Sequence, residues 1–182
     1  QIAAYTKLLV EHGTVIAEAR ADLIAALCPS ASHAQSGISG RDESLGLNYL
    51  RSGGEDLATA YEQNADQDSR RRQTHIGPHR DDLILEIKGL PAGQFASEGQ
   101  QRTIALALKL AQAEVLREAK GADPILLIDD IFGELDQARR NALLTYLPKS
   151  SQKLITTTHL DWADDAFLTG SQRYLVDGSG VC

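Results

Sequence analysis

Hydrophobic residues recur at three- and four-residue steps through the first part of the chain, from Gln1 to about Leu27. This spacing places them on one side of a helix. The stripe is long and Ala-rich, which suits one limb of a helical arm, although an ordinary packed helix has the same pattern. Pro29 is expected to end the helix, because proline lacks the backbone N–H group. Residues 30–44 hold many serines and few large apolar groups, so a flexible loop is predicted there.

Shorter elements follow in the next fifty residues or so. The alternating pattern of residues 45–50 predicts a strand, and Ser52-Gly53-Gly54 predicts a turn. Residues 55–72 are polar and helix-prone, with Leu57, Ala58 and Tyr61 as the inward candidates. A turn at Gly77-Pro78 then leads into a strand that carries Leu83, Leu85 and Ile87 on one face.

A capped helix is predicted from Ser97 to about Ala119, with Gly121 closing it. Ser97 stands at the N-cap and Gln100 at the third helical position, which completes a capping box. Gly99 keeps the first turn free of a side chain, so the N–H groups and the positive end of the helix dipole are open to an anion such as phosphate. The alternative is that Ser97 and Gln100 only cap the helix.

The last third of the chain predicts a βαβ unit. Four apolar residues, Ile125 to Ile128, run into Asp129 and Asp130, as a buried parallel strand does when it delivers carboxylates to the edge where ligands bind. A helix over residues 137–147 leads to a second strand over 154–158, followed by His159. A last strand is predicted from Arg173 to Val176. The fold class is therefore α/β, with a mostly parallel sheet and helices on both faces.

Composition bounds the function loosely. The 182 residues are 42% hydrophobic and 24% charged, with no signal peptide and no apolar run of membrane-spanning length, so a cytoplasmic protein without membrane contact is predicted. Cys28 and Cys182 form neither a metal pair nor a disulfide framework.

The net charge of −7 restricts any DNA contact to a local patch. The candidate patch is Arg70, Arg71 and Arg72, which could equally be a solvated helix end.

The segments S-E-G-Q-Q-R-T, from Ser97, and L-L-I-D-D-I-F-G-E-L-D, ending at Asp136, resemble the signature and Walker B motifs of ABC-type ATPase heads. The sequences of these two segments, together with G-P-H-R-D-D-L from Gly77, are most similar to those of the RecF family of DNA-repair ATPases. The resemblance is good over 73–176 and weak over 1–72. It implies part of a helical arm lobe over residues 1–72 and the C-terminal half of an ABC-type P-loop ATPase head over 73–182.

The resemblance also implies roles for individual residues. Asp129 resembles the acid that holds Mg²⁺, and Asp130 occupies the position of the catalytic Glu; being one methylene shorter, it implies slow turnover. His159 resembles the switch histidine that senses the γ-phosphate, although a lone His after a strand is often structural. Asp136 resembles the D-loop acid at the dimer interface. The signature residues, which would contact ATP held by the partner subunit, are Ser97, Glu98, Gly99, Gln100, Gln101 and Arg102.

The chain contains no G-x-x-x-x-G-K-[ST] phosphate loop, so this fragment is expected to be inactive alone, and its first residue, Gln1, suggests a longer protein. The resemblance implies a slow, DNA-dependent ATPase that forms an ATP-dependent homodimer and binds gaps and junctions of single- and double-stranded DNA. It would act with RecR and RecO in DNA repair, recombination, replication and the SOS response. The alternatives are an SMC-like structural head that tethers DNA and, with less support, the motor of an ABC transporter.

Overall fold

The computed structural model describes residues 2–177 and 180–181, and the chain divides into two compact units at Pro124 and Ile125. The predicted boundary at residues 72/73 falls inside the first unit, where β1 (Leu45–Leu50) pairs with β2 (Asp82–Ile87) across it. The assignment of the two parts to an arm lobe and an ATPase head stays a prediction. Gln1 and Cys182 lie outside the described residues.

Helix α1 spans Ile2–Ser39 and passes straight through Pro29, so the predicted helix end at Pro29 and the predicted loop over 30–44 are wrong. A proline inside a helix costs about 3 kcal/mol. Burying Ile38 alone returns roughly 1.5–3 kcal/mol, and Ala31, Ala34 and Gln35 are buried beside it. Tertiary packing therefore outweighs the local signal, and only residues 40–44 form the loop.

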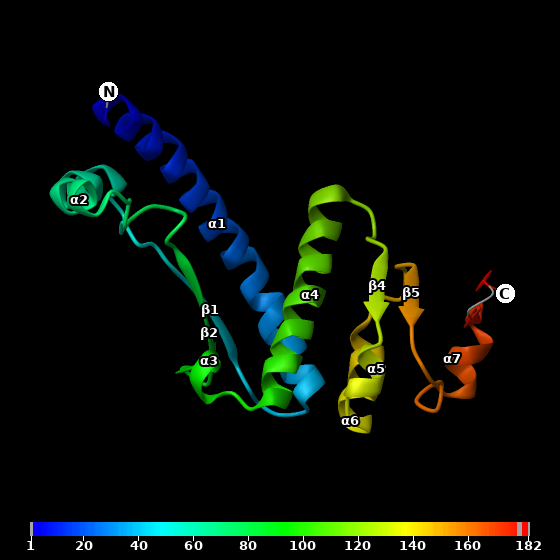
Figure 1. The fold of residues 1–182 in the computed structure, drawn as a ribbon. Coiled ribbons are helices and arrows are strands. Elements are labelled where there is room, and N and C mark those ends of the chain that lie inside the picture. Colours follow the sequence, from blue (N-terminus) through cyan, green and yellow to red (C-terminus); the bar gives the residue numbers. More distant parts are fainter. Residues whose placement is uncertain (1, 178–179, 182) are drawn as a thin grey trace. The chain divides into compact units, whose positions relative to one another are not determined.

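The three-stranded sheet of the first unit is antiparallel, in the order β1-β2-β3, with β3 at Leu90–Pro91. The predicted strands over 45–50 and 83–87 are confirmed, with Leu45 opposite Ile87 and Leu50 opposite Asp82. Along this ribbon lie α1 and, near one end, α2 (Leu57–Arg71) (Figure 1).

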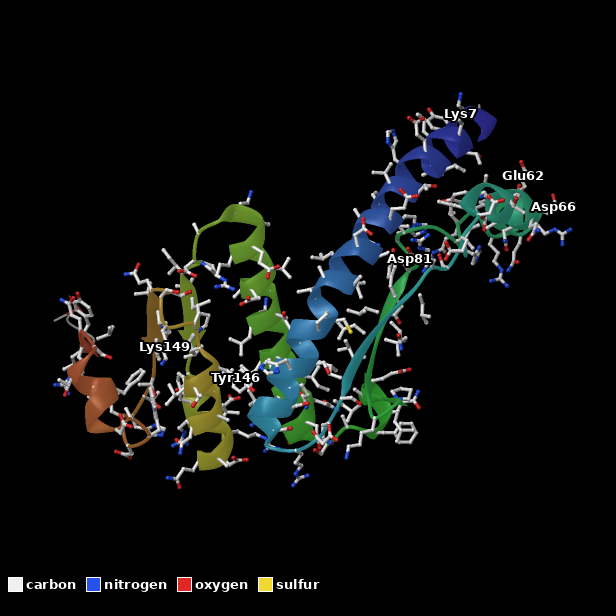
Figure 2. The ribbon with its side chains drawn as sticks, turned by 180° about the vertical axis from the view of Figure 1, so that it is seen from behind. Lys7, Glu62, Asp66, Asp81, Tyr146 and Lys149 are labelled. Carbon is white, nitrogen blue, oxygen red and sulfur yellow. The ribbon has the colours of Figure 1, made fainter. Side chains whose placement is uncertain are left out.

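Helix α2 begins at the N-cap Asp56, whose carboxylate accepts from the backbone N–H of Thr59 at 3.1 Å. Its inward residues are Leu57 and Tyr61, which pack with Ile76. Ala58 is exposed, so its prediction as an inward residue is wrong; Ala60 packs there instead. Acidic residues such as Glu62 and Asp66 lie on the exposed side of this helix (Figure 2).

Helix α4 spans Glu98–Lys120 and lies along the C-terminal part of α1 (Figure 1). The short helix α3 (Ala92–Phe95) precedes it. The predicted ends of α4 are confirmed: Ser97 is the N-cap, the capping box with Gln100 is formed, and Gly121 closes the helix in the left-handed conformation. Thr103, Ile104, Ala107, Ala111 and Ala113 are its buried residues.

The second unit contains the predicted βαβ arrangement. β4 (Leu126–Asp129) pairs in parallel with β5 (Lys153–Thr156), and α5 (Ile131–Glu134) and α6 (Gln137–Tyr146) connect them. β4 is not buried on both faces as predicted, since Leu127 is 76% exposed. This parallel pair is the only one among the described strands, because the other two sheets are antiparallel.

The chain ends with α7 (Asp165–Thr169) and the antiparallel pair β6 (Val176–Asp177) and β7 (Gly180–Val181). The predicted last strand from Arg173 to Val176 is therefore wrong for its first three residues. Tyr174 and Leu175 are more than 60% exposed, and no described strand offers them a backbone partner.

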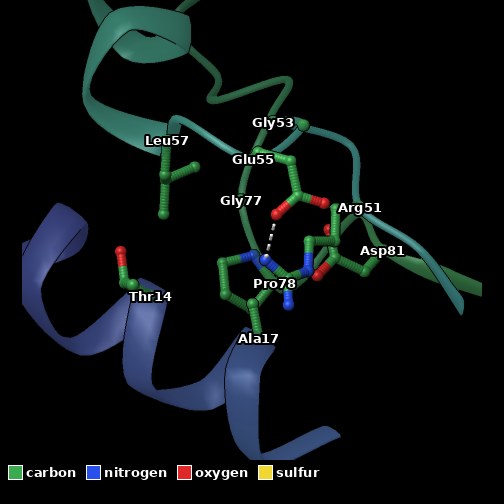
Figure 3. Close-up of a pocket in the computed structure, with 10 residues that line it drawn as sticks. Thr14, Ala17, Arg51, Gly53, Glu55, Leu57, Gly77, Pro78 and Asp81 are labelled. Atoms are coloured by element: carbon green, nitrogen blue, oxygen red, sulfur yellow. Dashed lines mark hydrogen bonds and ion pairs between the residues drawn. The ribbon is translucent and has the colours of Figure 1, made fainter. Parts of the chain in front are cut away.

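A small cavity lies beside α1 in the first unit (Figure 3). Its lining includes Thr14, Leu57 and Pro78, together with the Arg51–Glu55 ion pair at 3.1 Å. The volume is about 20 Å³, room for about one water molecule. The cavity is thus a packing gap and is too small for a nucleotide.

Gly77 provides a test of this packing. Its φ is +116°, and a Cβ at this position would lie 2.5 Å from the hydroxyl of the buried Tyr61. Gly89 is the matched control, with φ +76° and no atom of the described residues within 4 Å of the added Cβ. We expect Gly89→Ala to lower the free energy of unfolding by about 1 kcal/mol and Gly77→Ala to lower it by about 2–4 kcal/mol. Denaturant unfolding measures both, and equal losses would contradict the predicted clash with Tyr61.

Candidate functional site

The start of α4 is held in one conformation by the capping box. The backbone N–H of Ser97 donates to Gln100 Oε1 at 2.9 Å, and the backbone N–H of Gln100 donates to Ser97 Oγ at 3.3 Å. Thr103 Oγ1 donates to the carbonyl of Gly99 at 2.8 Å one turn further along. The local sequence therefore fixes where the helix begins and how its first N–H groups point.

The first-turn N–H groups of Glu98 and Gly99 are open, with no acceptor in the described part of the chain. Helix geometry gives them no partner inside the helix, and the capping box uses the N–H of Gln100 instead. The neighbouring side chains of Glu98 and Arg102 pair with each other at 2.7 Å, and Gln101 Nε2 donates to the carbonyl of Ala96 at 3.1 Å. These open donors at the positive end of a 23-residue helix suit an anionic ligand.

Glu43, in the loop after α1, contacts the start of α4, which the sequence did not predict. Its side chain is 3% exposed, and Gln100 Nε2 donates to its Oε1 at 3.0 Å. Gln35 Nε2 donates to the other carboxylate oxygen at 3.3 Å. No local pattern marks residue 43, because its partners come from α1 and from a helix more than fifty residues later. The start of α4 is thus tied to the end of α1.

The carboxyl end of β4 carries the two predicted acids. Asp129 lies opposite Thr156 of β5, and Thr156 Oγ1 donates to Asp129 Oδ1. The backbone N–H of Asp130 donates to the carbonyl of Thr156 at 3.1 Å. Both acids are exposed, as predicted for carboxylates delivered to the edge of a parallel pair.

Asp130 has a left-handed backbone, with φ 47° and ψ 16°. Residues other than glycine adopt the left-handed backbone conformation at a cost of about 1–2 kcal/mol. Aspartate tolerates this conformation better than most residues. The following turn is anchored by Phe132, which is fully buried and stacks on Trp162 with ring centroids 4.3 Å apart. A strained residue at the tip of a strand is a common feature of functional sites.

The structure brings Asp130 and His159 to the same place. A Cβ added to Gly133 would lie 3.3 Å from His159 Cε1 and 3.7 Å from Asp130 Oδ1, so both side chains flank this glycine. Thr158 Oγ1 lies 3.1 Å from His159 Nδ1, and His159 Nε2 lies 4.0 Å from the Cβ added to Gly133. The exposed carboxylate and imidazole can therefore act on one ligand.

Asp136 has a role within its own chain that the sequence did not predict. It is the N-cap of α6, where it accepts from the backbone N–H of Arg139 at 2.9 Å and pairs with the Arg139 guanidinium at 2.6 Å. That backbone hydrogen bond, followed by the nearby guanidinium, holds the pKa of Asp136 below its ordinary value. The carboxylate is therefore ionised at neutral pH.

The predicted basic patch lies at the end of α2. Arg70 and Arg71 occupy the last turn, and Arg72 is the left-handed C-cap; all three are exposed. Arg71 Nη1 lies 3.3 Å from His75 Nε2, and His75 Nδ1 lies 2.7 Å from Asp68 Oδ1. The patch is accessible, and part of it is held in place by this chain of contacts.

A second polar cluster surrounds Asp81, the residue directly before β2, which is labelled in Figure 2. Its carboxylate accepts from the Tyr49 hydroxyl and from the backbone N–H of Ser52, the latter at 2.8 Å. Burial acts to raise the pKa of Asp81, but these hydrogen bonds outweigh it and hold the pKa below its ordinary value. Burial and the bond to Asp81 raise the pKa of Tyr49. The cluster fixes the turn at Gly77-Pro78, where Ser52 Oγ also donates to the carbonyl of Gly77 at 3.0 Å.

The described residues contain neither a self-sufficient metal cluster nor a membrane-spanning helix. No group of three or more His, Cys, Asp or Glu side chains is arranged to hold a metal ion by itself. Within the same residues, no helix has the length and apolar character needed to cross a bilayer.

Known proteins resemble this chain over most of its length. "DNA replication and repair protein RecF" of a Nostoc species is 39% identical over 179 residues, covering 93% of this chain and 48% of the relative. The protein of the same name from a Cyanothece species is 36% identical, covering the whole chain and 51% of the relative. The one from Lactobacillus delbrueckii subsp. bulgaricus is 43% identical over 143 residues. No model of a known protein family matches the chain.

The solved structures that match this chain are also RecF proteins. The chain matches the recombination mediator protein RecF with ATP, described within a RecFOR pathway, at a TM-score of 0.75 and 32% identity, over 87% of this chain and 45% of that one. A second RecF structure, with an ATP analogue, matches at a TM-score of 0.72. The fold is that of the C-terminal half of an ABC-type P-loop ATPase head.

The chain belongs to the RecF family. It spans about half the length of the curated relatives it matches.

The low pKa of Asp136 leads to a test in two parts. We expect Arg139→Ala to raise the pKa of Asp136 only partly, because the larger cause is the backbone N–H of residue 139, which alanine retains. The stabilisation of α6 by this cap should be present above about pH 4 and be lost as the pH falls through the lowered pKa. Carboxyl ¹³C NMR titration of the two proteins measures both values. A full return to the ordinary value in Arg139→Ala would assign the shift to the guanidinium.

Proposed function

We propose that this chain is the C-terminal part of an ATP-dependent DNA-binding protein of recombinational repair and replication restart, which dimerises on ATP and binds gapped DNA. The observation that carries the proposal is the meeting of Asp130 and His159 around Gly133, directly after the strand that ends in Asp129. The names of the relatives, DNA replication and repair protein RecF, support it and favour it over an SMC-like tethering head.

The start of α4 would act on a nucleotide held by the partner subunit. The open N–H groups of Glu98 and Gly99 would donate to the γ-phosphate oxygens, with Ser97, Gln100, Gln101 and Arg102 completing the signature motif. The motif would thereby make dimerisation depend on ATP, because one subunit supplies donors that the other subunit's triphosphate needs. The chain's own phosphate loop would come from the N-terminal half of the full-length protein.

The acids would act in their own subunit. Asp129 keeps one carboxylate oxygen free of Thr156, which fits a shell in which Mg²⁺ binds one or two carboxylates, water and phosphate rather than a full protein cage. Mg²⁺ would supply charge neutralisation of the phosphates. Asp130 would accept the hydrogen bond of the attacking water, and His159 would donate to the γ-phosphate. The short Asp130 side chain fits a slow ATPase.

The proposals for the DNA ligand, the partner proteins and the cellular location rest on the similarity to RecF proteins. We propose junctions of single- and double-stranded DNA as the ligand, with RecR and RecO as partners and the cytoplasm as the site of action. Support comes from the RecFOR pathway named for the matching structure and from the exposed basic patch. Asp136 would reach the dimer interface while capping α6.

The hydrolytic role of Asp130 leads to a direct test in the full-length protein. We expect Asp130→Asn to retain ATP binding and lose at least about 100-fold in turnover, since the amide is a poor acceptor for the proton of water. The variant should therefore accumulate as an ATP-bound dimer, which size-exclusion chromatography with light scattering detects. Asp123→Asn, at an exposed acid outside the site, is the control and should behave as wild type. An Asp130→Asn protein that stays monomeric with ATP would refute the role.

The basic patch leads to a second test in the full-length protein. We expect the double variant Arg70→Ala/Arg72→Ala to bind gapped DNA more weakly and to reduce the slope of log K against log salt by about one to two, because each phosphate contact releases counterions. Lys109→Ala/Lys120→Ala, which removes two exposed cations of α4, is the control of equal charge. Fluorescence anisotropy across a salt series measures both slopes. Equal slopes for the two variants would assign the patch to the solvated end of α2.

A further inference from the structure

The buried carboxylate of Glu43 has no place in the proposed chemistry. Its two oxygens accept hydrogen bonds from the side-chain amides of Gln35 and Gln100, so the charge is satisfied by amides and by no cation among the described residues. Burying a carboxylate in this way is costly. The carboxylate supplies the acceptor that the Gln100 side-chain amide needs.

The geometry determines the orientation of the Gln100 amide. The backbone N–H of Ser97 can only donate, so the Gln100 atom that receives it must be Oε1. The Nε2 group then faces Glu43, which offers an acceptor. Gln100 therefore spans two fixed groups, and a residue at position 43 without an acceptor would leave its amide free to turn out of the capping box.

The end of α1 fixes Glu43 in turn. Ser36 Oγ donates to the carbonyl of Glu43 at 3.3 Å, and the backbone N–H of Leu45 donates to Ser32 Oγ at 3.3 Å. Gln35 itself is fully buried, and its Oε1 has no hydrogen-bond partner among the residues that the structure describes. The loop after α1 thus presents the carboxylate from a rigid base.

We propose that Glu43 is a positioning residue for the signature motif: through Gln100 it holds the Ser97 capping box, and so aims the open N–H groups of Glu98 and Gly99 at the partner subunit's nucleotide. The proposal rests on the proposed function of the signature motif. It makes the end of α1 part of the machinery by which two subunits close on ATP, although no residue of α1 would touch the nucleotide.

The test uses the full-length protein and measures two quantities. One is ATP-dependent dimerisation, by light scattering over a protein concentration series; the other is binding of a fluorescent ATP analogue at concentrations where the protein is monomeric. We expect Glu43→Ala to weaken dimerisation about tenfold or more, since small misplacements of positioned groups have large effects. Nucleotide binding by the monomer should be unchanged, because the motif acts on the other subunit's ATP.

Three variants separate positioning from simple stability. Gln35→Ala removes the other amide from the same carboxylate and leaves the Glu43–Gln100 contact in place, so it should lower Tm but not dimerisation. Glu43→Gln should restore dimerisation, because its Oε1 accepts from Gln100 while its amide donates to the unpartnered Oε1 of a flipped Gln35. Glu118→Ala, at an exposed acid of α4, should leave both quantities unchanged.

The outcomes are distinct. Dimerisation that is unchanged in Glu43→Ala, or reduced equally in Gln35→Ala, overturns the positioning role. If Glu43→Ala does not fold, Glu43→Asp decides by the same two measurements, since its carboxylate is drawn back from Gln100 by one methylene. Ser97→Arg tests the signature motif itself: if it dimerises with ATP as wild type does, the proposed function fails, whereas a loss there with a normal Glu43→Asp refutes only the inference about Glu43.

Discussion

The packing of the last part of α1 against α4 is the constraint on which the candidate site of the first unit depends. Small buried residues occur on both helices, among them Ala31 and Ala34 on α1 and Ala107 and Ala111 on α4, and such residues allow close approach of helix backbones. The same packing keeps α1 helical beyond Pro29. Without it, the loop after α1 would have no fixed position, and neither would the carboxylate that meets Gln100.

The second unit achieves its geometry by different means. The parallel register of β4 and β5 sets Asp129 beside Thr156, and the left-handed backbone of Asp130 turns the chain immediately afterwards. The buried stack of Phe132 on Trp162 holds that turn. A short apolar contact thus supports two exposed polar side chains, Asp130 and His159.

The sequence predicted best what is encoded locally. The capping box at Ser97, the end at Gly121 and the acids after β4 are each read from a few adjacent residues, and the structure confirms these positions. The errors come from long-range packing. Pro29 and the serines that follow it favour a loop, but burial against α4 overrides them. Glu43 and Trp162 could not be found, because their partners are distant in sequence or carry no spacing signal.

The contact between Glu43 and Gln100 also restricts how the sequence of such a protein can vary. Position 43 must offer an acceptor as long as position 100 offers an amide donor, and a buried group left without a partner costs about 1–3 kcal/mol. Substitution at either position alone is therefore penalised, whereas a joint exchange for two well-fitting apolar side chains can be nearly neutral for folding. The two positions, 57 residues apart along the chain, are expected to mutate as a pair.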